Sequence, residues 1–338
     1  MTFTCDAMVM REPGAPDVLE RRTIELSWPG KPDEVLVKLE AAGINPADTF
    51  FRALGPYIGD GVGATLGHDG AGVVEAVGEA VTEFSVGDRV AFCNGGVGGD
   101  PGTYASHAVV PEWLLARVPD NVDMVQAAAL PLVFITIWES FVERARLQAG
   151  ETVLVHAGAG GTGHLAIQVA RQLGATVATT VSSEKKSAFA AALGAEKTIN
   201  YRKEDFVTAT RQWTRDKGVD VALDNIGPEG FQATLGTLAP YGRIVTLMGS
   251  PGDVDETAYN ANLSIHNVMM LTPMWLGLDD YRRNQGAITR RAMEWLGESR
   301  IKVEIAATYP LDQVADAHTR LEAGGNMGKI VLTLAGEK

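Results

Sequence analysis

A histidine and an aspartate stand side by side in a glycine-rich stretch that reads LGHDGAGVVEAVG over residues 66–78. A neutral imidazole is the commonest protein ligand for a metal, so His68 raises the question of a metal centre. Asp69 and the nearby Asp48 add carboxylate oxygens, which suit harder cations. A catalytic zinc needs three protein ligands and one open position, so the other ligands decide whether His68 holds a metal or remains from a lost site.

A second group of residues with clear chemistry is the loop AGAGGTG over 157–163, which follows the apolar run ETVLVHA. Its Gly158 permits a tight turn, Gly160 lets the backbone approach a pyrophosphate, and Gly163 allows a helix to pack closely on a strand. The helix that follows offers unpaired N–H groups to phosphate. A simple turn is the alternative, but the strand-to-helix context favours a dinucleotide. The residues predicted to bind cofactor here are Gly158, Gly160, Gly161, Thr162 and Gly163.

The end of the next apolar run indicates which dinucleotide to expect. An NAD site places Asp or Glu there to bond the ribose 2′-hydroxyl. In this chain Val181 is followed by SSEKK instead, and a 2′-phosphate requires such hydroxyl donors and cations. Ser182, Ser183 and Lys186, joined by Tyr201 from the next strand end, provide that chemistry, so the sequence predicts NADPH. A serine that caps the following helix, with Glu and Lys on a solvated face, is the structural alternative.

The elements that must position these residues change character along the chain. Residues 1–120 contain short β-branched runs separated by Gly and Pro, which predicts a strand-rich barrel. Residues 124–150 are rich in helix formers around Pro131 and mark a junction. From residue 151 strands alternate with helices, as in a doubly wound parallel sheet that binds ligands at the carboxyl ends of its strands. The predicted fold class is therefore α/β, with a strand-rich second domain.

Length and charge narrow the classes of function. A chain of 338 residues exceeds what one hydrophobic core usually serves, so two domains are expected. The net charge of −13 repels phosphate backbones and argues against nucleic acid as a partner. No window approaches the ~20 consecutive apolar residues of a membrane span, and the N-terminus does not resemble a signal peptide. Two cysteines are too few for a disulfide framework, so we expect a cytoplasmic protein without a membrane partner.

Six ordered segments resemble the medium-chain dehydrogenase/reductase superfamily over essentially the whole chain. They are AAGINPADTFFR (41–52), GHDGAGVVEAVGEAV (67–81), VGDRVAF (86–92), AAALPLVFITIW (127–138), VLVHAGAGGTGHLAIQVARQLGA (153–175) and INYRKEDF (199–206). The last two, with the double serine, look most like the zinc-independent quinone oxidoreductase, or zeta-crystallin-like, branch. The resemblance implies a GroES-like barrel catalytic domain over 1–123 and 273–338, and a Rossmann dinucleotide-binding domain over 124–272.

The resemblance also bears on His68. In the zinc-dependent members of the superfamily, a Cys, a His and a second Cys hold the catalytic metal. Asn45 stands where the first Cys would be and Leu132 where the second would be, so His68 alone keeps its ligand type. The structural zinc lobe is missing too, because VAFCNGGVGGDPGTYASH has one cysteine where zinc-dependent relatives carry four. The sequence therefore predicts no metal, with oxygen ligation by Asp48 and Asp69 as the alternative.

Without a metal, the acceptor must be one whose developing charge can be stabilised by hydrogen-bond donors. A quinone or an α,β-unsaturated carbonyl spreads the incoming electrons over a conjugated system. The predicted catalytic donors are Asn45, at the lost metal position, Tyr57 in GPYIGD and Thr136 in FITIW. The alternatives are that Asn45 orders the cofactor end of the site and that Tyr57 anchors a mobile loop. His68 is either a further donor to the substrate or a loop residue bonded to backbone, and both interpretations stay open.

The predicted function is NADPH-dependent, zinc-independent hydride transfer to a quinone or an α,β-unsaturated carbonyl. Three alternatives stay open: an enoyl-thioester reductase, a zinc-dependent alcohol dehydrogenase, and a crystallin-like protein that holds NADPH without using it. The segment SIHNVMML (264–271) is predicted to form a sheet edge. An unpaired apolar edge favours pairing with a second copy, and family members commonly form such homodimers.

Overall fold

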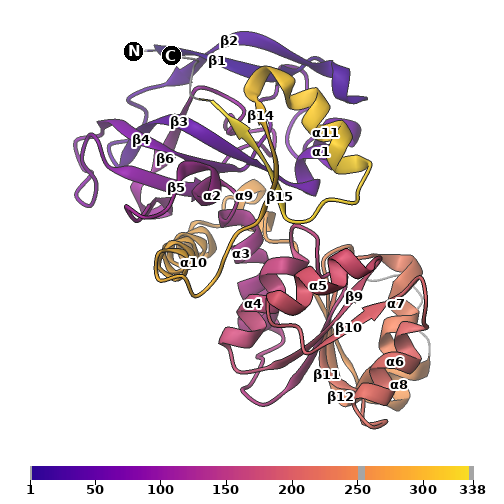
Figure 1. Ribbon diagram of the computed structural model, residues 1–338. Helices are drawn as coiled ribbons and strands as arrows, with labels where there is room; N and C mark the ends of the chain where they lie inside the picture. Colours follow the sequence, from indigo (N-terminus) through magenta and orange to yellow (C-terminus); the bar gives the residue numbers. More distant parts are fainter. Residues whose placement is uncertain (1, 250–255, 335–338) are drawn as a thin grey trace. The chain divides into compact units, whose positions relative to one another are not determined.

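The computed structural model describes residues 2–249 and 256–334, which form two compact units (Figure 1). The first unit comprises the chain up to Ile135, Leu271–Gly325 and the segment from Lys329 onward. The second unit comprises Thr136–Met270 and Asn326–Gly328. The domain boundaries expected from the sequence, after residues 123 and 272, stay a prediction. Within the described ranges no helix is both long and apolar enough to cross a membrane.

The second unit contains a parallel sheet with the strand order β10-β9-β8-β11-β12-β13. The first strand of the sheet, β8, lies in the middle. The next two strands, β9 and β10, lie on one side of β8, and β11, β12 and β13 lie on the other side. This reversal between β8 and β11 is the topological switch point at which doubly wound sheets bind ligands. The strands are β8 (Thr152–Val155), β9 (Thr176–Val181), β10 (Lys197–Asn200), β11 (Val219–Asp224), β12 (Leu238–Thr246) and β13 (Ser264–Asn267). The α/β prediction is therefore confirmed.

Helices connect these strands and cover the sheet (Figure 1). They are α4 (Gly163–Gln172), α5 (Glu184–Ala192), α6 (Phe206–Trp213), α7 (Pro228–Leu235) and α8 (Glu256–Asn260), preceded by a π-helical turn, η3 (Glu139–Arg144). Apolar residues of the strands, such as Leu154, Ile199 and Ile244, form one cluster with Phe231 of α7. Asp205 begins α6 by accepting the backbone N–H of Thr208 at 2.8 Å, as expected for a cap.

The first unit is rich in strands. A sheet has the order β14-β15-β3-β4-β5-β7, β6 pairs with β3, and β1 and β2 form a separate antiparallel pair. The strands are β1 (Thr2–Met10), β2 (Leu19–Ser27), β3 (Glu34–Ile44), β4 (Asp69–Val77), β5 (Arg89–Cys93), β6 (His107–Pro111), β7 (Ala116–Arg117), β14 (Ile305–Pro310) and β15 (Lys329–Thr333). The helices are α1 (Pro46–Leu54), α2 (Met124–Ala128), α9 (Thr272–Trp275), α10 (Asp279–Gly297) and α11 (Val314–Glu322), with short 3₁₀ turns η1 (Pro16–Val18), η2 (Glu112–Leu114) and η4 (Leu311–Gln313). Helix α3 (Pro131–Trp138) runs from the first unit into the second.

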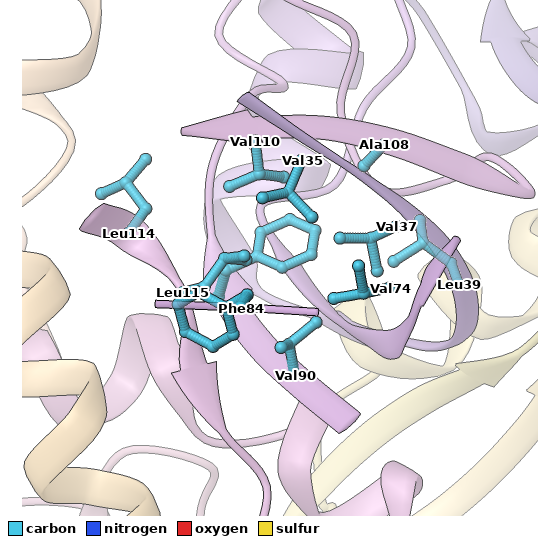
Figure 2. Packing of buried hydrophobic residues seen from close by; sticks show 11 residues of the cluster. Val35, Val37, Leu39, Val74, Phe84, Val90, Ala108, Val110, Leu114 and Leu115 are labelled. Carbon is cyan, nitrogen blue, oxygen red and sulfur yellow. The ribbon is translucent and has the colours of Figure 1, made fainter. Parts of the chain in front are cut away.

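One apolar cluster unites the strands of this barrel (Figure 2). Alternate residues of β3, namely Val35, Val37 and Leu39, point into it, as the two-residue period of a strand requires. They meet Val74 of β4 and Val90 of β5, so that neighbouring strands share one core. This pattern explains why the short β-branched runs of the sequence form one strand-rich domain.

Strand pairing also brings together the ends of β3, β4 and β15. Ile44, at the end of β3, pairs with Ile330, and Gly43 pairs with Asp69 at the start of β4. Gly43 has no side chain because a Cβ there would overlap the carbonyl oxygen of Ala128 in α2. Three polar residues therefore meet where the three strands end: Asn45, Asp69 and Lys329.

Candidate functional site

The polar residues at these strand ends form a buried hydrogen-bonded cluster, which we call the Asn45 cluster (Asn45, Asp69 and Lys329). The side-chain N–H of Asn45 donates to Asp69 Oδ2 at 2.8 Å, and the ammonium of Lys329 donates to Asn45 Oδ1. Lys329 also donates to the backbone carbonyl of Ile44 at 3.0 Å. The exposed fractions of Asn45 and Lys329 are 1% and 4%, so the amide and the cation lie together inside the first unit.

Burial changes the acid–base properties of the charged members. The pKa of Asp69 is raised to about 6, chiefly by desolvation, while the charge of Lys329 opposes that shift. The pKa of Lys329 is lowered, again chiefly by desolvation, and Asp69 is the largest opposing influence. The second oxygen of Asp69 accepts the backbone N–H of Leu132 at 2.7 Å. Thus Leu132 contributes its backbone N–H to Asp69.

His68 is completely buried beside this cluster. Its Nδ1 lies 2.6 Å from the carbonyl oxygen of Gly95, and because a carbonyl only accepts, Nδ1 carries a proton. Its Nε2 lies 3.4 Å from Oδ1 of Asp48, whose other oxygen accepts the backbone N–H of Asn45 at 2.7 Å. Burial raises the pKa of Asp48, and His68 is the largest opposing influence. His68 thus bonds to the backbone, as expected for a loop histidine. A contact between His68 and the substrate stays a prediction.

The residues around His68 do not fit a zinc ion. The side-chain oxygen of Asn45 is already bonded by the Lys329 ammonium, and a cation there repels a second cation. Leu132 offers no ligand atom. Among the described residues, no three His, Cys, Asp or Glu side chains are grouped so that they could hold a metal ion. The donor set therefore suits hydrogen bonding rather than metal coordination.

Tyr57 lies at the surface of the first unit, with an exposed fraction of 51%. Its ring stacks on Trp275 of α9 with the ring centres 3.9 Å apart, and it meets the edge of Phe51 at 5.1 Å. Phe51 in turn packs edge-on against His68 at 5.5 Å. These aromatic contacts link the exposed Tyr57 to the buried polar cluster. Trp275 was not predicted, because it lies in a four-residue helix without a recognisable motif.

The glycine loop between β8 and α4 has the shape that a dinucleotide loop requires. A Cβ on Gly158 would overlap the side chain of Thr179, and one on Gly163 would overlap the carbonyl oxygen of Ala157. A Cβ on Gly160 would have the Ala157 oxygen as its nearest neighbour, at 3.3 Å. Crowding by protein therefore explains Gly158 and Gly163 but not Gly160. An open face at Gly160 is what close approach of a pyrophosphate would need.

The loops after β9 and β10 bring most of the remaining cofactor candidates together. The backbone N–H of Tyr201 donates to the carbonyl of Val181 at 3.1 Å, which joins the two strand ends. Ser183 caps α5 by accepting the N–H of Lys186 at 3.3 Å, so the structural alternative accounts for this serine. Ser182 and Lys186 are half-buried beside it, and Tyr201 is exposed. Thr136, the last catalytic candidate, belongs to the second unit, where its carbonyl accepts the Ser140 hydroxyl at 2.7 Å.

Two further polar groups were not predicted from the sequence. Lys203 pairs with Glu184 at 2.8 Å, which places another cation beside the loops after β9 and β10. In the first unit, the Tyr104 hydroxyl bonds Nε2 of His318 at 3.0 Å, although the residues are 214 positions apart. Desolvation lowers the pKa of His318 to about 3 and keeps this imidazole neutral. No local motif marks either pair, because each forms only when distant segments pack together.

Comparison with known proteins agrees with the fold. Residues 31–120 match the model of the alcohol dehydrogenase GroES-like domain, and residues 193–332 match that of the zinc-binding dehydrogenase family. The chain is 37% identical to a quinone oxidoreductase of Pseudomonas aeruginosa over 94% of this chain and 96% of that protein. It is 33% identical to a 2-haloacrylate reductase of a Burkholderia species over 96% of this chain and 98% of the relative.

Solved structures give the same assignment. A mycobacterial protein in complex with NADPH superposes with a TM-score of 0.83 at 31% identity, over 97% of this chain and 100% of that one. Near-complete coverage at more than 30% identity leaves no large segment unaccounted for. The resemblance predicted from the sequence is thus confirmed: the chain belongs to the medium-chain dehydrogenase/reductase superfamily of nicotinamide-dependent oxidoreductases, in its quinone oxidoreductase branch.

Proposed function

We propose that this protein transfers a hydride from NADPH to a quinone or an α,β-unsaturated carbonyl compound without a metal ion. The observation that carries the proposal is the Asn45 cluster, in which an amide held by Lys329 stands where zinc-dependent relatives have a ligand. A simple alcohol or aldehyde would lose its Lewis acid in such a site. A conjugated acceptor suits it, because the charge that develops on the acceptor is delocalised and a hydrogen-bond donor can stabilise it.

Bound NADPH supplies a hydride, that is, two electrons and one hydrogen. The reaction balances when the acceptor also takes up one proton, giving NADP⁺ and a hydroquinone or a saturated carbonyl. On this proposal Asn45 donates an N–H to the acceptor oxygen, and Tyr57 stacks on Trp275 beside the acceptor and donates the proton. Thr136 and His68 stay candidates for further contacts with the acceptor.

NADPH is favoured over NADH by the residues after β9. No acidic residue directly follows Val181, where it would bond a ribose 2′-hydroxyl, and the hydroxyl of Ser182 stands there instead. Two cations, Lys186 and Lys203, and the phenol of Tyr201 are also available to a 2′-phosphate. The related mycobacterial structure that contains NADPH supports the same choice. Gly158, Gly160, Gly161, Thr162 and Gly163 would then hold the pyrophosphate.

The proposal for the assembly starts from the edge of the sheet in the second unit. β13 lies at the edge of the second unit's sheet, as the sequence predicted, although the strand ends at Asn267 rather than continuing to residue 271. An unpaired edge favours association with a second copy, so we include a homodimer in the proposal. The cytoplasmic location expected from the sequence stays a prediction.

The test is the oxidation of NADPH by chelator-treated protein in the presence of para-benzoquinone, an enone, a 2-haloacrylate, an enoyl thioester or an aldehyde, with NADH in parallel. Turnover of the quinone or enone that survives chelation, with NADPH preferred, would support the proposal. Turnover of the aldehyde alone, restored by added zinc, would contradict it. NADPH binding without turnover of any acceptor would indicate a crystallin-like protein instead.

A further inference from the structure

We propose that Lys329 is a positioning residue for the reaction: its buried ammonium fixes and polarises the Asn45 amide, whose second N–H then donates to the acceptor oxygen. The inference rests on the proposed function and deepens it, because it names the source of the positive charge that stabilises the developing oxyanion. Three features of the described residues support it, namely the orientation of the amide, the burial of the lysine and the place of the lysine at the start of β15.

The orientation of the Asn45 amide follows from the chemistry of its partners. An ammonium group can only donate, so the atom that faces Lys329 is the amide oxygen. The ionised form of Asp69 can only accept, so the atom that lies 2.8 Å from it is the amide nitrogen. An amide nitrogen has two N–H groups, and one contact with Asp69 uses one of them. Within residues 2–249 and 256–334 the structure gives this nitrogen one hydrogen bond, to Asp69, and the proposal assigns its second N–H to a bound acceptor.

The burial of Lys329 requires an explanation, because a lysine is almost never fully buried unless it is paired. The titratable groups that face it are Asp69 from β4, Asp48 from α1 and Cys93 from β5. A buried ion pair is weak evidence for stability, since apolar residues of similar volume often serve as well. A cation placed on the oxygen of an amide has a chemical effect instead. It draws electron density from the amide and strengthens its N–H groups as donors, as in any polarised hydrogen-bond chain.

The position of Lys329 in the chain also suits this role. Lys329 begins β15, which pairs with β3 next to Asn45. Its backbone is therefore held by the sheet of the first unit, and a fixed side chain can hold the amide without reorganisation during the reaction.

The first experiment compares Lys329→Met, which removes the charge at similar length, with Lys329→Arg, which keeps it. For quinone reduction we expect Lys329→Met to lower kcat ~10- to 100-fold, because the polarised N–H matters most for charge that develops in the transition state. KM and the Kd for NADPH should change less than ~3-fold, since neither reports that charge. Lys329→Arg should recover most of kcat. An unchanged kcat in folded Lys329→Met would overturn the proposal.

A double-mutant cycle tests whether Lys329 acts through Asn45. Asn45→Ala removes the donor and should lower kcat ~100- to 1,000-fold, as the loss of one oxyanion donor does elsewhere. In that background Lys329→Met should lower kcat further by less than ~2-fold, because the group it polarises is gone. Independent, multiplicative losses would overturn the proposal and leave Lys329 a structural role.

Lys329→Met leaves Asp69 without its counter-charge and can therefore fail to fold. In the pair Asp69→Asn and Asp69→Asn/Lys329→Met no carboxylate at residue 69 loses its counter-charge, and in the single variant Asp48 still faces the Lys329 ammonium. The proposal expects kcat to be ~10-fold lower in the double variant than in Asp69→Asn, whereas equal kcat would overturn it. The activity of the wild type distinguishes a failure of the proposed function from a failure of the role proposed for Lys329. Without quinone or enone turnover by the wild type, the proposed function fails; with turnover but no effect of Lys329, this inference alone fails.

Discussion

Replacing Gly160 by alanine should weaken NADPH binding without weakening the fold. Gly160 does not have a positive φ, so its backbone conformation is one that alanine can adopt. The nearest atom to a new Cβ is the Ala157 oxygen, 3.3 Å away. Such a site tolerates alanine, and the smaller entropy of the unfolded chain offsets the tight contact by roughly 0.4–1 kcal/mol. We therefore expect the melting temperature to change by less than about 2 °C.

The same Cβ would stand where the backbone must approach the pyrophosphate. We expect a loss of NADPH affinity of ~10- to 100-fold, which corresponds to about 1.4–2.8 kcal/mol. The assay is a fluorescence titration with NADPH, run beside thermal unfolding of the same samples. Gly236→Ala is the matched control, because its Cβ would lie 3.2 Å from the Ala233 oxygen, in the same unit but outside the loop.

Gly163→Ala should show the opposite pattern. Its Cβ would overlap the carbonyl oxygen of Ala157, so the loop or α4 must shift, at a cost of about 1–3 kcal/mol in stability. Its melting temperature should fall clearly below that of Gly160→Ala. If Gly160→Ala binds NADPH as tightly as the wild type, the assignment of this loop to the pyrophosphate is wrong. If the two variants are destabilised equally, the distinction between a crowded and an open glycine is wrong.

Three further predictions concern the charged cluster, the aromatic pair and the 2′-phosphate. Burial raises the pKa of Asp69 in the folded state to about 6, against its ordinary value of 3.8, so the folded state holds more protons between these two pH values. Stability should then fall by roughly 3 kcal/mol as the pH rises from about 4 to above 6, and urea unfolding should show that this component is missing in Asp69→Asn. Trp275→Ala removes the ring on which Tyr57 stacks and should raise KM for quinones ~3- to 10-fold, since an aromatic pair contributes about 0.5–1.5 kcal/mol; an unchanged KM would remove this pair from the acceptor site. Lys186→Glu should lower the ratio of kcat/KM for NADPH over NADH ~10-fold or more by like-charge repulsion, and an unchanged ratio would place the 2′-phosphate elsewhere.

Local sequence patterns were enough to predict most of the fold and part of the candidate site. Strand period, helix period and the G-x-G-x-x-G spacing all act over fewer than about 20 residues, so the doubly wound sheet and its glycine loop were predictable. The resemblance of its segment to a family was enough to predict that Asn45 replaces a metal ligand. The residues that surround Asn45 in the fold could not be predicted in this way. Lys329 lies 284 positions from Asn45 and meets it only through the pairing of β15 with β3.

A signal for Lys329 does exist in the sequence, although it is weak. The run KIVLTL begins a strand whose residues are buried, and a lysine at the first position of such a strand must find a counter-charge. The sequence does not say which acid provides it, because the register of an antiparallel pair depends on both strands. The stack of Tyr57 on Trp275 escaped prediction for a similar reason: α9 is a single turn placed by tertiary contacts.

The Asn45 cluster also indicates why cysteines at positions 45 and 132 alone would not create a zinc site. Lys329 would still direct its ammonium at residue 45, and it would hold a thiolate there as an ion pair in competition with the metal.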